Sequence, residues 1–435
     1  MVWRSDFERR IISSQDAAKL VMSGARVHLP QGSSEPKNFG MALAARRGEL
    51  SNVELVIPTP RRDFPWYEPG WEDTFKLSVG YLLPRWRGRL QGRVDHLIGS
   101  IAWRMKAQEE RPSEAKQTDL YITEVSPPDK HGFCSFGPAR WDKKERLRAA
   151  KVALGQLNSS LIRTYGDNFI HYSEIDHFIE DVARPPREPE PPEIPESVRT
   201  IAGYVRDILR DGDTIQVGAG RTSEAMPIAG ALEGKNDLGI HTEFVAYGLI
   251  GLVRQGVITG RRKTINTGKV VAASCWGTAE DMEFVHENPV FELYGPPYTM
   301  DIRTIAAQDN MATINSALAV DLTGEIAAES IGPQMYSGAG GQLAFVIGAL
   351  LSRGGRAITV LPAASSDGRL SRIVPMFEQG TVVTIPRTCV DYVVTEYGVA
   401  RLYDKTQRER AHELIAIAHP DFRDELRLAA RKLYG

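Results

Sequence analysis

A glutamate near a glycine-rich turn is the feature of this sequence that could do chemistry. Glu243 ends the segment DLGIHTE and stands 23 residues beyond Gly220, the last glycine of the turn QVGAGRT (216–222). A carboxylate is a weak nucleophile in water, but it can attack a carbonyl once it is desolvated and faced by backbone N–H donors. On spacing alone, a glutamate at this place is more commonly a helix-start or surface residue, so the other motifs must decide.

Two glycine clusters could supply such donors. Gly218, Ala219 and Gly220 follow the apolar run TIQV and precede TSEAMPIAGAL, which we expect to be helical. Glycine lets a backbone approach a ligand closely, although a tight turn without a ligand would also explain the cluster. It lacks the third glycine and the later acid of a dinucleotide fingerprint, so NAD binding is disfavoured. The second cluster is SGAGGQLAF (337–345), and either loop could donate N–H groups to a thioester oxygen that becomes negative in the transition state.

Other reactive side chains give weaker signals. The sequence has no G-x-S-x-G elbow, and Ser126 and Ser173 are more typical of caps or turns. The spacing of His171 and His177 does not suit two ligands of one metal ion, so no metal is expected. Glu396 ends the apolar run YVVTE, where the active sites of α/β proteins lie, and is a second candidate for the pocket.

Composition limits the class of protein. A chain of 435 residues exceeds what one core usually supports, so we expect two or three domains. The net charge of −2 and the 42% hydrophobic content fit a soluble globular protein and do not indicate nucleic acid or an anionic membrane as a partner. Cys134, Cys275 and Cys389 have no metal or disulfide spacing, so we expect reduced thiols in a cytoplasmic protein. Neither a signal peptide nor a membrane span is expected.

A proline-rich stretch, RPPREPEPPEIPE (184–196), divides the chain. Proline removes backbone donors and disfavours helix in the residue before it, so the stretch is expected to be an extended linker between domains at 1–183 and 197–435. On both sides, short β-rich runs alternate with amphipathic segments. This alternation predicts an α/β fold with open, mostly parallel sheets covered by helices, in which ligands bind at the carboxyl ends of strands.

The expected strands are short, rich in β-branched residues, and end in Pro, Gly, Ser or Asn. They comprise residues 25–31, 52–59, 119–126 and 151–158 before the linker, and 213–220, 263–268, 357–365, 382–387 and 390–398 after it. Apolar residues at three- and four-residue spacing predict a helix over 197–212. The C-terminal segment is also expected to be helical, with Pro420 opening a new helix.

Eight motifs in one order resemble the acetyl-CoA hydrolase/transferase family, and in particular its 4-hydroxybutyrate and butyrate CoA-transferases. The motifs are VSPPDKHGFCSFG (125–137), NSSLIRTYGDNFIHYSEID (158–176), DLGIHTE (237–243), INSALAVDLTGEIAAES (314–330), SGAGGQLAF (337–345), SRIVP (371–375), VVTEYGVARL (393–402) and IAHPDFR (417–423). A collinear set is far more specific than any one member. The resemblance implies two NagB/RpiA/CoA-transferase-like α/β domains.

The resemblance also implies roles for individual residues. The nucleophile of the family's G-[IV]-H-[ST]-E motif corresponds to Glu243, and the implied backbone oxyanion donors are Ala219 and Gly341. The implied coenzyme A loops consist of Gly218, Ala219, Gly220, Arg221 and Thr222, and of Gly340 and Gly341. Asn288, in HENP, and Glu396 would be supporting pocket residues.

The chemistry implied by the family is ping-pong transfer of coenzyme A between short-chain carboxylates through a glutamyl–CoA thioester. Coenzyme A is then a substrate, and no metal or permanently bound cofactor is needed. Acyl-CoA and small carboxylic acids are the expected partners, and the protein is expected to be a homodimer that binds neither nucleic acid nor membrane. Two other readings remain open. The same residues would serve acyl-CoA hydrolysis, whereas a non-catalytic acyl-CoA-binding protein would have no need of Glu243.

Two positions depart from the family pattern. Tyr247 stands where the family commonly has a smaller residue after the nucleophile, and Glu325 replaces a neutral amide in DLTGEIAAES. Tyr247 would fill space near the nucleophile and could reshape the acyl or acceptor pocket. The sequence therefore indicates the reaction class but not the acids involved.

Overall fold

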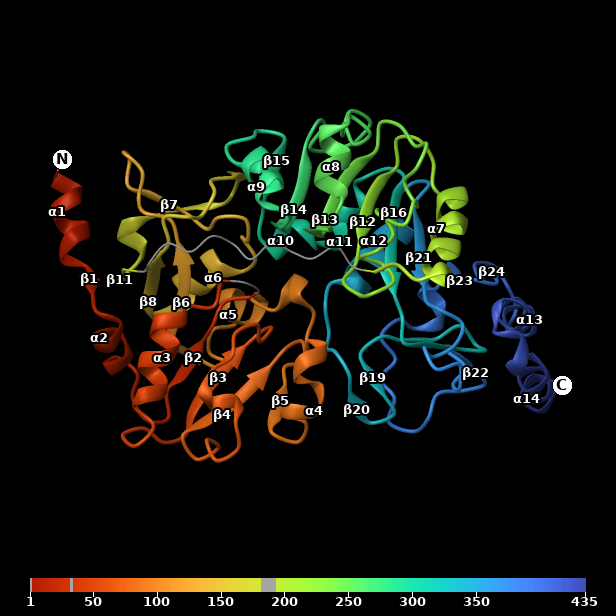
Figure 1. Cartoon of the computed structure of the whole chain (residues 1–435), viewed down its shortest axis with the longest axis horizontal. Helices are drawn as coiled ribbons and strands as arrows, with labels where there is room; N and C mark the ends of the chain where they lie inside the picture. The colour runs from red at the N-terminus through yellow and green to blue at the C-terminus, as the bar shows by residue number, and fades with distance from the viewer. Residues whose placement is uncertain (1, 32–33, 181–192) are drawn as a thin grey trace. The chain divides into compact units, whose positions relative to one another are not determined.

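The chain folds into two compact units. The computed structural model describes residues 2–31, 34–180 and 193–435, so the predicted linker at 184–196 lies mostly outside the described residues (Figure 1). The first unit comprises Met1–Gly99, Trp103–Glu188 and Met282–Pro296, and the second comprises Ser100–Ala102, Pro189–Asp281 and Pro297–Gly435.

One segment beyond the linker belongs to the first unit. Residues 282–296 would fall in the C-terminal domain if the linker were the only boundary. They join the first unit because β15 (Phe291–Leu293) pairs in parallel with β9 (Tyr165–Gly166). The domain boundary is therefore not a single point in the sequence.

The first unit is built on a sheet of eight parallel strands. Their order across the sheet is β1 (Ile11–Ile12), β11 (His177–Ile179), β8 (Ala150–Leu157), β6 (Thr118–Val125), β2 (Arg26–His28), β3 (Val53–Ile57), β4 (Phe75–Val79) and β5 (Val94–His96). Its helices are α1 (Val2–Arg9), α2 (Ser14–Lys19), α3 (Lys37–Ala45), α4 (Arg87–Leu90), α5 (Lys106–Glu110) and α6 (Lys143–Ala149). A small antiparallel pair joins β7 (Phe133–Ser135) to β10 (Phe169–His171).

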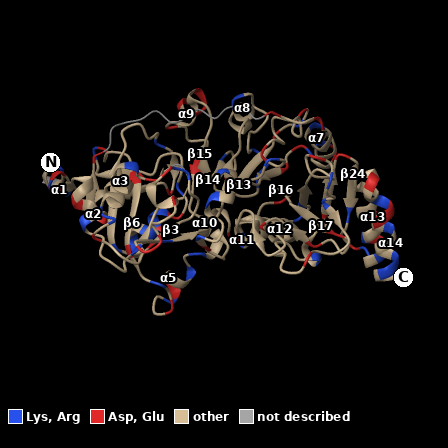
Figure 2. Cartoon of the chain, turned by 60° about the horizontal axis from the view of Figure 1, so that its bottom comes forward, with Lys and Arg blue, Asp and Glu red and all other residues tan. Residues whose placement is uncertain are grey.

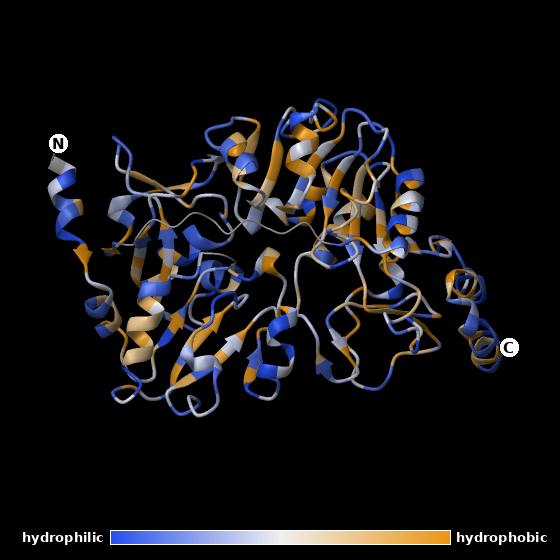
Figure 3. Ribbon diagram, viewed as in Figure 1, coloured by the Kyte–Doolittle hydropathy of each residue, from blue (hydrophilic) through white to orange (hydrophobic). Residues whose placement is uncertain are grey.

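The second unit holds another mostly parallel sheet. Its strands run in the order β24 (Gly398–Arg401), β23 (Tyr392–Thr395), β21 (Arg356–Val360), β16 (Met311–Ser316), β12 (Thr214–Val217), β13 (Gly239–Val245) and β14 (Val270–Cys275). Only β24 is antiparallel to its neighbour among these strands. Every residue of β12, β14 and β21 is buried, as expected when both faces of a parallel sheet are covered, and Figure 3 shows β14 in largely hydrophobic colours.

Helices and short strands complete the part of the chain after the linker. The helices are α7 (Glu196–Ile208), α8 (Leu249–Arg254), α9 (Ala279–Val285), α10 (Pro296–Thr299), α11 (Ile302–Ala306), α12 (Gln342–Leu351), α13 (Gln407–Ile417) and α14 (Arg423–Tyr434). The short strands are β17 (Ala319–Asp321), β18 (Ile326–Ala327), β19 (Ser330–Ile331), β20 (Gln334–Met335) and β22 (Ile373–Val374). Figure 2 shows charged residues of both signs along α13 and α14. No helix of the described residues is both long and apolar enough to cross a membrane.

The two-unit α/β architecture with open, mostly parallel sheets confirms the expected fold class, but three expected elements are wrong. Residues 263–268 form turns, because Gly268 N–H bonds to Gly260 O at 2.9 Å and closes a loop. Residues 382–387 contribute only an isolated bridge at Ile385. The helix expected after the first glycine cluster is a series of turns, and Pro227 in its middle has no N–H to continue a helical ladder.

Candidate active site

The candidate site lies at the carboxyl edge of the sheet in the second unit. Because β12, β13, β16, β21 and β23 are parallel, their C-terminal ends share one edge. Glu243 stands near the end of β13, the first glycine loop follows β12, and Glu396 follows β23. This is the edge at which open α/β sheets bind ligands.

Glu243 contacts the second glycine cluster directly. The N–H of Gly341 donates to Oε2 of Glu243 at 3.2 Å. Gly341 is the N-cap of α12 with φ −85° and ψ −6°, a conformation open to any residue, so its backbone does not require glycine. A larger residue would nevertheless displace the carboxylate, because a Cβ at this position would lie 2.5 Å from Glu243 Oε2. Glycine therefore lets the carboxylate reach the start of a helix, where negative charge is stabilised.

The surroundings of this contact are apolar. A Cβ on Gly341 would lie 3.4 Å from both Met300 Sδ and Phe345 Cε2, and these two side chains are fully buried. Glu243 itself is half-buried. The carboxylate thus lies between an apolar floor, formed by Met300 and Phe345, and the open carboxyl edge of the sheet, so it is partly desolvated.

His241 supports the strand beneath Glu243. Side chains alternate along a strand, so His241 and Glu243 lie on the same face of β13. The Nε2 of His241 lies 2.9 Å from the carbonyl oxygen of Thr299, which identifies it as the donor. Burial, with a smaller effect of the Lys263 charge, lowers the pKa of His241 to about 3. The imidazole is therefore neutral at physiological pH and acts as a support rather than as a proton carrier.

The first glycine loop leaves one backbone donor open. Gly218 N–H bonds to Ile314 O at 2.8 Å, and Gly220 N–H bonds to the carboxylate of Glu224 at 2.9 Å. Between them, the N–H of Ala219 has no acceptor among the described residues, and Ala219 is exposed. Of these three N–H groups, that of Ala219 is the one available to a ligand.

Side chains that the sequence did not single out hold this loop in place. Ser223 Oγ donates to Gly218 O at 2.6 Å, and Ser223 N–H donates to Ser316 Oγ at 2.9 Å. The amides of Gln216 and Asn315 exchange two hydrogen bonds, at 3.1 and 3.0 Å, between neighbouring strand ends. A Cβ on Gly218 would lie 2.0 Å from Asn315 Oδ1, so this amide pair is what requires glycine there. The sequence did carry a signal for Asn315 and Ser316, because polar residues end the largely apolar strand β16 in the segment TINS (313–316).

The two glycine loops are connected through Ser316. Gln342, the first residue of α12, donates from Nε2 to Ser316 O at 3.4 Å, while Ser316 Oγ holds the first loop. Gly340 borders open space, since a Cβ there would meet no atom within 4 Å. In the first loop, Arg221 is exposed and Thr222 is buried.

Glu396 and Asn288 belong to different units. Glu396, half-buried in the turn between β23 and β24, accepts a hydrogen bond from Ala363 N–H at 2.9 Å, at the same sheet edge as Glu243. Asn288 belongs to the first unit, where its amide donates to Phe284 O and accepts from Val290 N–H, both at 3.0 Å. These bonds give Asn288 a role in the turn that follows α9.

The two departures from the family pattern lie in turns. Tyr247 is half-buried in the turn that follows β13, four residues beyond Glu243. Glu325 lies in the turn between β17 and β18, where its N–H bonds to Asp321 Oδ1 at 3.0 Å. Of the two, Tyr247 is on the element that carries the candidate nucleophile.

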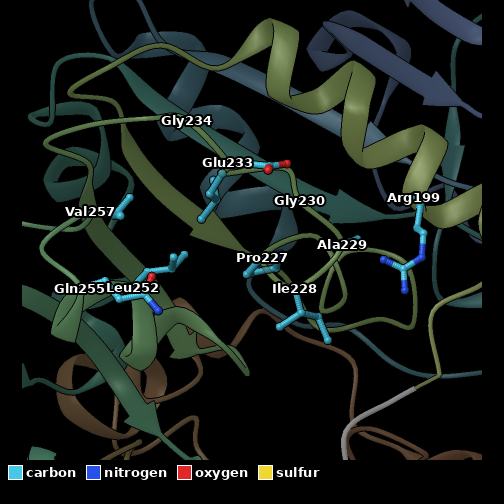
Figure 4. A pocket seen from close by; sticks show the side chains of 11 residues that line it. Arg199, Pro227, Ile228, Ala229, Gly230, Glu233, Gly234, Leu252, Gln255 and Val257 are labelled. Atoms are coloured by element: carbon cyan, nitrogen blue, oxygen red, sulfur yellow. The ribbon is translucent and has the colours of Figure 1, made fainter.

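A surface hollow of about 470 Å³ in the second unit is separate from these residues (Figure 4). It is lined by part of the turn segment after the first glycine loop, by the end of α8 and by Arg199. None of the predicted site residues lines it. The hollow therefore adds no group to the candidate site.

Comparisons with known proteins connect this geometry to a family. The family model of the acetyl-CoA hydrolase/transferase C-terminal domain matches residues 277–430. The chain is 35% identical to the 4-hydroxybutyrate coenzyme A transferase of Clostridium kluyveri, over 98% of each chain. It is 37% identical to the succinyl-CoA:cyclohexane-1-carboxylate CoA transferase of Geobacter metallireducens, over 99% of this chain and 97% of the relative. The crystal structure of RipA from Yersinia pestis superposes with a TM-score of 0.91 at 30% identity, over 99% of each chain.

Proposed function

We propose, since this chain belongs to the acetyl-CoA hydrolase/transferase family, that it transfers coenzyme A between short-chain carboxylic acids through a covalent intermediate on Glu243. The observation that carries the proposal is the hydrogen bond from Gly341 N–H to Glu243 Oε2 at the carboxyl edge of the sheet. This hydrogen bond supports a Glu243 carboxylate that is positioned for attack, near the open backbone N–H of Ala219. The names of the relatives support transfer of coenzyme A between carboxylic acids, one of them the short-chain acid 4-hydroxybutyrate, while the acids that this protein uses are left open.

In the first half of the reaction, Glu243 attacks the thioester carbonyl of the acyl-CoA. The carbonyl oxygen becomes negative and accepts the N–H of Ala219, and the C–S bond breaks to give an acyl–glutamyl anhydride and the CoA thiolate. The thiolate then attacks the glutamyl carbonyl. A carboxylate of the first acid leaves, and a glutamyl–CoA thioester remains.

Gly341 serves the step at the glutamyl carbonyl. Its N–H already holds Oε2 in the resting enzyme, and the same atom becomes the carbonyl oxygen of the anhydride and of the glutamyl thioester. Negative charge develops on that oxygen whenever the glutamyl carbon is attacked, so the donor is in place beforehand. Ala219 and Gly341 thus act on two different carbonyl groups.

The second half reverses these steps. The carboxylate of a second acid attacks the glutamyl thioester, releases the thiolate and forms a new anhydride. The thiolate attacks the acyl carbon of the new acid, which yields its CoA thioester and regenerates the Glu243 carboxylate. The apolar floor of Met300 and Phe345 keeps water from that side of the anhydride, which supports transfer over hydrolysis.

Substitution of Glu243 tests the proposal. Glu243→Ala should reduce transfer from butyryl-CoA to acetate by about 10⁴-fold or more, because the nucleophile is gone. Glu233→Gln, at an exposed position of the same unit, is the control. Wild-type protein incubated with acyl-CoA should also gain the mass of a CoA adduct that the Glu243→Ala protein lacks. Transfer that survives in Glu243→Ala would refute the mechanism.

The acceptor dependence separates transferase from hydrolase. A transferase releases little CoA from acetyl-CoA alone and passes it to added butyrate or succinate, whereas a hydrolase releases CoA without an acceptor. A homodimer is part of the same proposal and is tested by sedimentation analysis. Neither measurement depends on knowing the natural acids.

A further inference from the structure

Ser223 follows the first glycine loop and donates to the peptide unit that carries the open backbone donor. Its Oγ lies 2.6 Å from Gly218 O, and a carbonyl oxygen cannot donate, so the hydroxyl hydrogen of Ser223 points to that oxygen. Gly218 C=O and Ala219 N–H belong to one planar peptide unit, in which the C–N bond has partial double-bond character. Ser223 therefore acts on the same amide group whose N–H has no acceptor among the described residues.

A second serine completes a chain of hydrogen bonds. Ser316 Oγ lies 2.9 Å from Ser223 Oγ. Because the single hydroxyl hydrogen of Ser223 is already directed to Gly218 O, Ser316 is the donor in this contact. Ser316 Oγ also accepts the N–H of Ser223 at 2.9 Å. The hydrogen bonds thus run in one direction, from the Ser316 hydroxyl through the Ser223 hydroxyl to Gly218 O, and the last amide ends in the N–H of Ala219.

This chain of hydrogen bonds is held in a fixed place. Ser223 is fully buried, and Ser316 is the last residue of β16, which pairs with β12 on one side and with β21 on the other. Gly220, with φ 149°, makes room for Ser316, because a Cβ on Gly220 would lie 2.6 Å from Ser316 Oγ. Dipoles that are fixed before the reaction need no reorganisation when charge develops, which is the condition for strong electrostatic stabilisation.

We propose that Ser223 and Ser316 are positioning residues that polarise the Gly218–Ala219 peptide, so that the Ala219 N–H binds the oxygen of the reacting thioester more strongly. The proposal rests on the proposed function, because it assumes that this oxygen accepts the N–H of Ala219. A hydrogen bond accepted by an amide C=O makes the N–H of that amide a better donor, since the bonds of a chain polarise one another. Both serines act through Ala219 rather than on the substrate itself.

Steady-state kinetics of Ser223→Ala test this assignment, in transfer from butyryl-CoA to acetate. The variant keeps the Ala219 N–H but loses the hydrogen bond that polarises it, so kcat should fall about tenfold, less than the roughly 10²–10³-fold loss of a whole donor. The KM of butyryl-CoA should not change, because the stronger bond forms only in the transition state. Ser316→Ala should lower kcat by a smaller factor. The double variant should lose no more than Ser223→Ala alone, because Ser316 acts only through Ser223.

A second measurement distinguishes the two carbonyl groups. The glutamyl–CoA adduct formed from butyryl-CoA is treated with hydroxylamine. Its nitrogen attacks the glutamyl carbonyl, the C–S bond breaks, coenzyme A leaves as the thiol, and a glutamyl hydroxamate remains. Gly341 serves this carbonyl, so the rate constant of coenzyme A release should be the same in Ser223→Ala and in the wild type. A serine that merely shaped the loop would not discriminate between the two carbonyl groups.

Ser352→Ala is the matched control. Ser352 is also buried and its Oγ donates to a backbone carbonyl, that of Gln308, but it precedes β21 at the opposite edge of the sheet, so kcat should keep its wild-type value. Thermal unfolding of every variant reports on the fold, and Ser316→Ala, at a half-buried position, carries the same test should Ser223→Ala fail to fold.

Three results would overturn the proposal: a wild-type kcat in Ser223→Ala, a rise in the KM of butyryl-CoA at unchanged kcat, or an equal loss in the release by hydroxylamine. Transfer that survives in Glu243→Ala would instead refute the proposed function. A Ser223→Ala enzyme with full activity beside an inactive Glu243→Ala enzyme would refute the role of the serines alone.

Discussion

Gly341→Ala is expected to impair catalysis without impairing folding. The added methyl group would lie 2.5 Å from Glu243 Oε2, so the carboxylate must retreat by about 1 Å to reach an ordinary contact distance. That movement stretches the 3.2 Å hydrogen bond from Gly341 N–H and displaces the nucleophile. A misplacement of this size costs about 10²-fold in rate, so kcat should fall by roughly that factor. The backbone of Gly341 is helical, so alanine introduces no strain there.

The neighbouring glycine provides a matched control. An alanine at Gly340 would meet no atom within 4 Å, so Gly340→Ala should keep kcat within a few-fold of the wild-type value. The assay is transfer from butyryl-CoA to acetate at saturating substrate, with thermal unfolding of all three proteins. A Gly341→Ala enzyme with wild-type kcat would refute the reasoning, as would an equal loss in Gly340→Ala.

Two further predictions concern stability. Glu35 is buried and accepts the N–H groups of Arg61 and Arg62, but burial raises its pKa to about 7. The contribution of its protonated form to stability is therefore present below about pH 4.5 and is lost as the pH rises through 7. Glu35→Gln should stabilise the protein by about 3 kcal/mol at pH 8 and by little at pH 4.5. An equal change in the free energy of unfolding at both pH values, measured in urea, would contradict this. Arg356 forms a buried ion pair with Asp213. Arg356→Met should therefore lower the free energy of unfolding by about 3–5 kcal/mol, because it leaves a buried carboxylate unpaired. Adding Asp213→Leu should recover most of this stability, as measured by thermal unfolding.

Of the three strands in the large sheet of the second unit in which every residue is buried, β12 and β21 were predicted from the sequence, whereas β14 was not. β12, β21 and β23 are short apolar runs with turn residues at their ends, and local pattern is sufficient to identify them. Residues 263–268 have a similar composition but form turns, because a loop closed between Gly260 and Gly268 overrides the local preference. Composition does not distinguish the two cases, since the deciding contact lies outside the segment.

The motifs of the candidate site could be predicted from the sequence, but the contacts between them could not. Glu243 and Gly341 are 98 positions apart, and no local pattern indicates that they share a hydrogen bond. Ser223 and Ser316, which are 93 positions apart, were missed for the same reason. The resemblance to the family supplied roles for Glu243 and the glycines, whereas the contacts of Asn288 and Glu396 could only come from the fold.

The pairing of β15 with β9 affects how the chain can fold as it is synthesised. The first unit acquires its last strand only after Leu293, so the 97 residues from the end of the proline-rich stretch to Leu293 must leave the ribosome before that unit is complete. During this time β9 exposes an unpaired edge, which is a hazard for association with other chains. A fragment cut at the proline-rich stretch would carry that edge permanently, so the two halves are not expected to behave as separate soluble proteins.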